Sequence, residues 1–152
     1  MRIRAAAILI QNRALALLER HRQGSHYFSF PGGGVDEGES PEQAVVREVL
    51  EELGVHVRVL RRVALFWFRG NPQHFFLVEQ IGGTFGAGTG KEFSADRNPA
   101  RGSYAPIWMP IDELAKHNVL PKPVAELIVR SYPDRWPAEP VTFSDEEPST
   151  SP

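Results

Sequence analysis

Short apolar runs separated by polar or turn-forming residues predict a strand-rich start to the chain. Residues 2–10 and 14–19 flank a polar turn, which is typical of a β-hairpin. A third short strand is predicted at residues 27–30. Pro31 ends that strand, and three successive glycines at 32–34 follow it. Because glycine adopts positive φ at little cost, this stretch is predicted to form a loop that approaches a ligand closely.

The clearest helix signal covers residues 41–53. Ser40 is suited to cap the N-terminus, with Gln43 three residues further on. Pro41 stands at the first helical position, where its missing N–H costs nothing, and Gly54 is placed to end the helix. The pattern therefore predicts one well-delimited helix directly after the glycines.

The rest of the chain continues the mixed pattern. Residues 56–69 and 74–80 are rich in β-branched and aromatic side chains and predict a second hairpin, with its turn at residues 70–72. Residues 82–101 are glycine-rich without periodicity and predict a long loop. A strand and two helical segments are expected further on, at 104–109, 111–116 and 123–130. From residue 137 the composition shifts to Pro, Ser, Asp and Glu, so residues 137–152 are predicted to be a disordered polar tail.

Composition narrows the class of protein. The chain has 152 residues, which suits one domain, and its Lys and Arg (17) nearly balance its Asp and Glu (19). The net charge of −2 argues against extended binding of long nucleic acids. The absence of cysteine excludes disulfides, thiolate metal sites and a cysteine nucleophile. Apolar runs are far too short to cross a bilayer and no signal-peptide pattern is present, so a cytoplasmic protein without membrane contact is expected.

The helix at residues 41–53 gathers acidic side chains on one face. At 100° per residue, Glu52 lies about 40° to one side of Glu48 and Glu51 about 60° to the other. The opposite arc is apolar and is expected to pack on the sheet; it consists of Val45, Val46, Val49, Leu50 and Leu53. A solvated acidic face is the ordinary explanation of such a pattern.

Two details favour a metal site instead. Like charges three and four residues apart repel, and Glu48 has both relations. Arg47 can pair with Glu51, but this leaves Glu48 and Glu52 without a partner on the helix. A divalent cation would relieve the repulsion, and all-oxygen ligands select Mg²⁺ or Mn²⁺ over zinc.

The spacing of these residues resembles a known family. Gly33, Glu39 and the run from Arg47 to Val55 match the complete signature of the Nudix hydrolases. The resemblance implies an α/β (α+β) fold, a Nudix-like αβα sandwich with a mixed central sheet, over residues 1–136. It also implies Mg²⁺-dependent hydrolysis of a pyrophosphate linkage in a nucleoside diphosphate derivative.

The resemblance also assigns roles. Residues matching Glu48 and Glu52 hold Mg²⁺ in the family, usually with the one matching Glu51, and a backbone carbonyl at Gly32 or Gly33 often completes the site. The residue matching Arg47 orients a glutamate, and the one matching Glu39 supports the loop. Two general bases stay open: Glu51, and Glu92 of a Gly-Lys-Glu stretch that resembles one in triphosphate-cleaving relatives.

Alternatives and weaker signals concern the substrate. A non-catalytic nucleotide-binding module of the same fold would be expected to lack acids of the signature, and none is missing. Tyr27, Phe28 and Trp67 are candidates for stacking on a nucleobase.

His26 and His74 are expected at the surface or a sheet edge, since neither has a second ligand at zinc spacing. The Gly-Lys-Glu stretch favours a nucleoside triphosphate, and Pro72 weakly favours a diphosphate linked to another group. The substrate is therefore predicted only as a small nucleotide, and a homodimer is compatible with the sequence.

Overall fold

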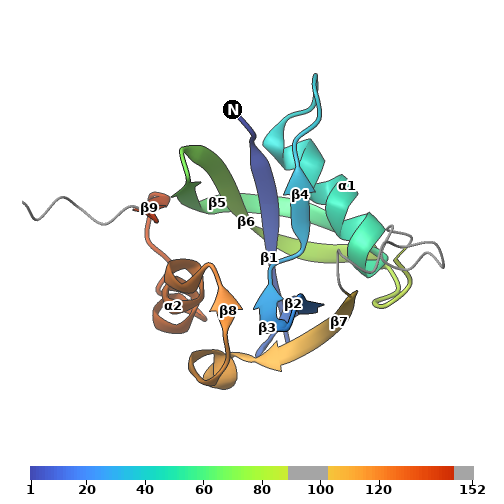
Figure 1. Ribbon diagram of the computed structural model, residues 1–152, viewed down its shortest axis with the longest axis vertical. Coiled ribbons are helices and arrows are strands. Elements are labelled where there is room, and N and C mark those ends of the chain that lie inside the picture. The colour runs from blue at the N-terminus through green and yellow to red at the C-terminus, as the bar shows by residue number, and fades with distance from the viewer. Residues whose placement is uncertain (89–102, 146–152) are drawn as a thin grey trace, which may run out of the picture.

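A mixed sheet carries one α-helix on each face (Figure 1). The computed structural model describes residues 1–88 and 103–145. The elements in chain order are β1 (Arg4–Gln11), β2 (Ala14–Arg22), β3 (Ser25–Ser29), β4 (Gly32–Gly34), α1 (Pro41–Leu53), β5 (Val55–Phe68), β6 (Asn71–Gly83), β7 (Ser103–Pro110), the 3₁₀ helix η3 (Ile111–Lys116), β8 (Val119–Leu120), α2 (Lys122–Ser131) and β9 (Val141–Ser144).

The strands pair in the order β8-β3-β2-β1-β6-β5-β9, with β4 added to β1 and β7 added to β2. The β1–β6, β3–β8 and β5–β9 pairs are parallel and the other pairs are antiparallel, so the sheet is mixed. Neighbouring residues of β1 face opposite ways: Ala7 packs with α1, whereas Ile8 packs with α2. This arrangement confirms the predicted αβα sandwich.

Two tight hairpins connect long strands. The β1–β2 turn consists of Asn12 and Arg13, both at positive φ (51° and 63°). The β5–β6 turn consists of Arg69 and Gly70, also at positive φ, and not of residues 70–72 as the sequence predicts. A two-residue turn of this kind follows the twist of the strands, and it places Pro72 at the start of β6 opposite Trp67.

Helix α1 begins and ends where the sequence predicts. The Ser40 side chain accepts from the Gln43 N–H, the Gln43 side chain accepts from the Ser40 N–H, and Gly54 ends the helix in the left-handed conformation. Val45, Val49 and Leu53 are fully buried against the sheet. Leu50, which the helical wheel places on the apolar arc, is 37% exposed, because the covered arc is narrower than predicted.

The glycine stretch forms strand β4, which corrects the prediction of a positive-φ loop. Gly32, Gly33 and Gly34 lie opposite Ala6, Ala5 and Arg4 of β1, and none of the three has positive φ. Glycine is required at 32 for space: a Cβ there would lie 2.3 Å from the carbonyl oxygen of Ala5. The sequence predicts a close approach to a ligand; in the structure Gly32 approaches the backbone of β1 and Gly33 approaches the Glu48 side chain of α1.

The C-terminal part differs from prediction at one strand. Strand β7, η3 and α2 agree with the predicted elements to within about one residue. Residues 141–144, predicted to lie in a disordered tail, instead form β9 alongside residues 64–67 of β5. Val141 and Phe143 pack on the core that α2 covers, so two apolar side chains anchor an otherwise polar segment. Of the predicted loop at 82–101, residues 89–101 lie outside the described part.

Within residues 1–88 and 103–145, no helix is both long and apolar enough to span a membrane.

Candidate functional site

Helix α1 presents its acidic face to strand β4. The backbone N–H of Gly32 donates a 2.7 Å hydrogen bond to Oε1 of Glu52, which fixes this carboxylate against the strand. The side chain of Glu48 is 17% exposed and lies against Gly33, whereas that of Glu51 is 44% exposed. Glu48 and Glu52 therefore both lie against β4, and the Glu51 side chain is more open to solvent than that of Glu48.

Arg47 connects the acids to the preceding loop. Its guanidinium donates to both oxygens of Glu39, at 2.9 and 3.0 Å, and to the carbonyl oxygen of Gly34 at 3.0 Å. Nη1 also contacts Glu48 at 3.0 Å and Glu51 at 3.5 Å. The helical wheel predicts the contact between Arg47 and Glu51, and the structure has it. The wheel leaves Glu48 without a partner on the helix, and this prediction is wrong, because the Arg47 guanidinium also contacts Glu48.

These contacts shift the ionisation of the acids in opposite directions. The hydrogen bonds from Arg47, with one from the Asp36 N–H, lower the pKa of Glu39 to about 2. Burial raises the pKa of Glu48, although Arg47 opposes the shift. Glu39 is thus a firmly ionised partner for Arg47, while the Glu48 carboxylate is held where its own charge is disfavoured.

A cleft of about 640 Å³ opens in front of the acids. Glu48, Glu51 and Glu52 line one side, together with the glycines of β4. Four arginines also line it, on β2 and at the start of β1: Arg2, Arg4, Arg20 and Arg22. Burial lowers the pKa of Arg4, with Arg2 adding to the shift and Glu52 and Glu48 opposing it. The cleft therefore combines carboxylates for a cation with guanidinium groups for an anion.

Sequence reasoning missed these arginines, although a signal was present. Arg2 and Arg4 are two residues apart, as are Arg20 and Arg22, so each pair falls on one face of an extended segment. The alternation identifies the pairs, but β1 and β2 bring them together only in the folded sheet.

A second cleft of about 760 Å³ adjoins the first and shares six of its residues, among them Tyr27 and Phe30. Its remaining wall is largely apolar and includes Phe66, Phe68 and Pro121. The guanidinium of Arg69 lies 5.0 Å from the centre of the Phe68 ring. The two clefts together form a continuous groove that is polar at the acids and apolar at the other end.

The aromatic candidates divide between the groove and the core. Tyr27 lines both clefts, which suits its predicted stacking role. Phe28 is 7% exposed in the core beneath β8, and Trp67 lines neither cleft. Both lie on the strand face opposite the groove, since side chains alternate along β3 and β5. The sequence could not assign the faces without knowing which side of the sheet carries the site.

Three further residues were singled out from the sequence. Glu92 falls outside the described residues, so its position relative to the acids stays a prediction. His26 is exposed on β3, as predicted. His74 is half-buried on β6 beside Arg62, and its burial lowers its pKa.

Comparison with known proteins agrees with this geometry. The family model of the NUDIX domain matches residues 1–131. An RNA pyrophosphohydrolase from Shewanella loihica is 52% identical over 56 residues, which cover 35% of this chain and 32% of that protein. One from Shewanella sediminis is 48% identical over 56 residues, 33% of its length. The chain thus spans about a third of the length of the curated relatives that it matches.

Solved structures show the same fold. An ADP-ribose pyrophosphatase from Streptococcus suis has a TM-score of 0.64 at 22% identity, covering 93% of this chain and 98% of that one. A structure from work on MutT of Aliivibrio salmonicida and Vibrio cholerae has a TM-score of 0.66 at 25% identity, covering 86% and 98%.

Proposed function

Because the chain belongs to the NUDIX domain family, we propose that it hydrolyses a pyrophosphate linkage in a small nucleoside diphosphate derivative, using Mg²⁺. The observation that carries this proposal is the composition of the first cleft. Three carboxylates on α1 and four arginines line the same cleft. Such a site suits a metal-bound polyphosphate, whose charge both groups help to offset.

The acids fit a hard divalent cation. All donors are oxygens, which Mg²⁺ and Mn²⁺ prefer, and the half-buried Glu48 carboxylate is held where its charge is disfavoured. Gly33 has no side chain, and the Glu48 carboxylate occupies the room that a Cβ at this position would need. We assign Glu48 and Glu52 as the principal ligands, with a backbone carbonyl of Gly32 or Gly33 as a further one; Glu51 joins them only if Glu92 is the base. When bound, Mg²⁺ would offset phosphate charge and acidify the attacking water.

The residues around the acids position them. Arg47 holds Glu48 in place, and Glu39 fixes Arg47 through two charge-assisted hydrogen bonds. The Gly32 N–H sets the orientation of Glu52. Arg47 and Glu39 are therefore positioning residues in this proposal.

One carboxylate must accept the proton from the attacking water. Glu51 is suited to this role because its side chain is more exposed than that of Glu48 and Arg47 contacts it at 3.5 Å. Glu92 is the second candidate, on the resemblance of its Gly-Lys-Glu stretch. We retain both and favour Glu51.

The groove supports a nucleotide with several phosphates. Four guanidinium groups exceed what one phosphate requires, and each can bind phosphate oxygens through two N–H groups. The apolar second cleft, with Tyr27 at the junction, suits a nucleobase or another ring. A nucleoside triphosphate suits both the four guanidinium groups and the apolar cleft. A nucleoside diphosphate linked to another group suits the apolar cleft equally well.

The named relatives add a third substrate. Curated relatives are RNA pyrophosphohydrolases, and the four arginines give the cleft a local positive charge that the net charge of −2 conceals. A 5′-phosphorylated RNA end therefore competes with a free nucleotide, although the sequence predicts no binding of long nucleic acid. A homodimer also stays a prediction.

Product analysis distinguishes these substrates. The purified chain is incubated at millimolar Mg²⁺ with nucleoside triphosphates, nucleoside diphosphates linked to a sugar or nucleoside, and a 5′-triphosphorylated oligonucleotide. Pyrophosphate with a nucleoside monophosphate identifies a triphosphate substrate, and a monophosphate with a second phosphorylated product identifies the linked diphosphate. If nothing is hydrolysed but a nucleotide raises the melting temperature, the chain is a nucleotide-binding module and the proposal is wrong.

A further inference from the structure

Two histidines and a glutamate gather on the sheet face that points away from the groove. His21 of β2 and His26 of β3 are directly opposed in the antiparallel register, and Glu19 precedes His21 by two residues on the same face. The adjacent residues Arg20, Arg22 and Tyr27 point the other way and line the groove. The cluster is therefore separated from the acids of α1 by the sheet itself.

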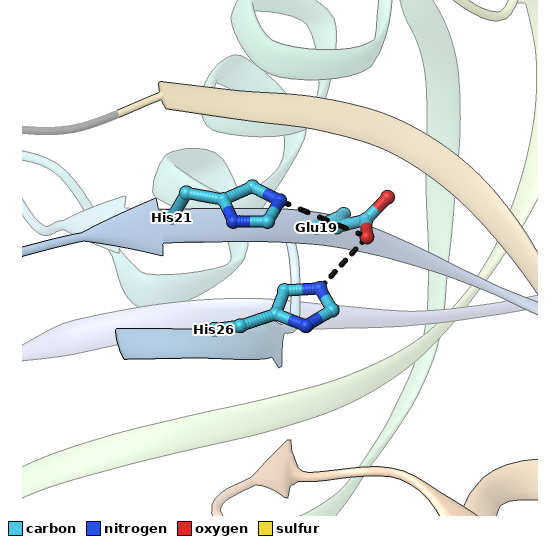
Figure 2. Close-up of side chains that lie close together, drawn as sticks. All are labelled: Glu19, His21 and His26. Carbon is cyan, nitrogen blue, oxygen red and sulfur yellow. Dashed lines mark hydrogen bonds and ion pairs between the residues drawn. The ribbon is translucent and has the colours of Figure 1, made fainter. Parts of the chain in front are cut away.

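The donor atoms of the cluster converge. Figure 2 shows the His21 and His26 rings on neighbouring strands, each with a nitrogen directed at the Glu19 carboxylate. Nε2 of His26 lies 2.7 Å from Oε2 of Glu19, and Nε2 of His21 lies 3.9 Å from the same oxygen. The two imidazole rings are stacked, with centroids 4.4 Å apart and planes 3° apart. All three ligand atoms fall within 4.8 Å of one another.

We propose that Glu19, His21 and His26 form a second metal site, selective for a borderline cation such as Zn²⁺. Ligands bonded to tetrahedral Zn²⁺ at about 2.0–2.1 Å lie about 3.3 Å from each other. The two observed nitrogen–oxygen separations bracket this value, so rotation of exposed side chains brings the three atoms to bonding distance. The site leaves a coordination position open to water.

The chemistry of the donors separates this site from the one on α1. Imidazole nitrogens bind zinc, nickel and copper well, whereas Mg²⁺ prefers oxygen donors alone. The carboxylates of α1 offer only oxygens, and the cluster on β2 and β3 offers two nitrogens and one oxygen. The two sites therefore sort cations by hardness, and occupation of one does not require the other.

The position of the cluster suggests its effect. Zn²⁺ bound there would connect β2 to β3 close to their shared turn at residues 23–24. The opposite faces of these strands carry Arg20, Arg22 and Tyr27 to the groove. A metal at the cluster would stabilise the hairpin that forms the arginine side of the groove, and the stability of the folded chain would rise with the logarithm of the free Zn²⁺ concentration once that concentration exceeds the dissociation constant.

Zinc titration of the metal-free chain tests the proposal. Isothermal titration calorimetry is run with Zn²⁺ in millimolar Mg²⁺ on the wild type, His21→Gln, His26→Gln and the control His56→Gln, which changes an exposed histidine on β5. We expect the affinity for one equivalent of Zn²⁺ to fall at least about tenfold in His21→Gln and in His26→Gln. The affinity should stay unchanged in the control. In millimolar Mg²⁺, zinc should also raise the melting temperature of the wild type and the control by more than that of the two variants.

Three further measurements make the result decisive. The melting temperatures of all variants in EDTA must agree with that of the wild type, which confirms that they fold. A titration of Glu52→Gln identifies any binding of Zn²⁺ to the acids of α1. Such binding remains in both histidine variants and is lost in Glu52→Gln. X-ray absorption at the zinc edge of the wild type should show two imidazoles per metal. Identical titrations in all four chains, or zinc surrounded by oxygen alone, would overturn the proposal.

Discussion

Gly33 of β4 lies directly against the carboxylate of Glu48 on α1. A Cβ at position 33 would be 2.5 Å from both the carboxyl carbon and Oε1 of Glu48. The absence of a side chain at Gly33 therefore determines where the Glu48 carboxylate lies. A residue that the sequence suggests as a flexible loop element instead sets the geometry of a proposed metal ligand.

Alanine at position 33 should impair the site more than the fold. Gly33→Ala forces the Glu48 carboxylate out of its position, because the new methyl group would overlap it. We expect Mg²⁺-dependent hydrolysis to fall about 10- to 100-fold, as for other changes that displace a metal ligand. The measurement is kcat/KM on the substrate identified by product analysis, together with the melting temperature.

Gly34→Ala is the matched control. A Cβ at Gly34 would meet only Arg2 side-chain atoms at 4.0 Å, so activity and stability should both stay near the wild type. Gly32→Ala should instead impair the fold, because its Cβ would overlap the backbone of β1. We expect this variant to have a lower melting temperature. Equal activities of Gly33→Ala and Gly34→Ala would contradict the assigned geometry.

Replacing the general base should separate proton transfer from metal binding. If Glu51 is the base, Glu51→Gln should lower kcat about 10²–10⁴-fold while the Mg²⁺ concentration for half-maximal rate hardly changes. If Glu92 is the base, Glu92→Gln should show this behaviour and Glu51→Gln should not. Rate profiles against Mg²⁺ for both variants are the measurement, and a normal kcat in both would exclude the two candidates.

An arginine of the groove should contribute to phosphate binding. Arg22 is exposed and lines both clefts, so Arg22→Gln should raise KM for a polyphosphorylated substrate about tenfold with little change in stability. Arg130→Gln, on the exposed side of α2, is the control and should leave KM unchanged. If Arg22→Gln and Arg130→Gln have the same KM, the substrate phosphates do not bind at Arg22.

Acid should weaken the fold through Glu39. Its pKa is about 2 in the folded chain against an ordinary value of 4.5, because it accepts hydrogen bonds from Arg47. Since folding lowers this pKa, the stabilisation is complete above pH 4.5 and is lost as the pH falls towards 2. Glu39→Gln should have a lower melting temperature near neutral pH and a flatter decline in acid.

The exposed Glu37 provides the control for this effect. Melting temperatures of the wild type, Glu39→Gln and Glu37→Gln are compared from about pH 6 to about pH 2.5. Glu37→Gln should follow the wild type. Parallel curves for Glu39→Gln and the wild type would show that the contact between Glu39 and Arg47 adds no pH-dependent stability.

Local signals in the sequence predicted most of the elements that build the site. The capping residues Ser40 and Gln43, the stop at Gly54 and the acid face of α1 all depend on neighbours within a few residues. The first hairpin follows from short-range alternation, whereas the αβα layers were predicted from the family resemblance. These features are predictable because the interactions that stabilise them are local in the chain.

Features that depend on distant pairing were not predictable. Strand β4 forms because β1 lies beside it, and β9 forms because Val141 and Phe143 reach a core built by α2. The register of β2 and β3 places His21 opposite His26. Four residues separate the two histidines, a spacing that zinc ligands adopt, so the sequence-based statement that His26 has no second ligand is wrong. Tertiary contacts also decide which aromatic side chains face the groove.

The central claim is that Glu48 and Glu52 hold the divalent cation required for hydrolysis, and the most direct test is the rate of Glu52→Gln against Mg²⁺ concentration. Glutamine keeps an oxygen that can accept from the Gly32 N–H, so the substitution removes the charge and preserves the contact. We predict no turnover by the wild type in EDTA and a loss of about 100-fold or more in Glu52→Gln and in Glu48→Gln, with the fold intact. Full turnover in EDTA, or wild-type rates from both variants, would contradict the account.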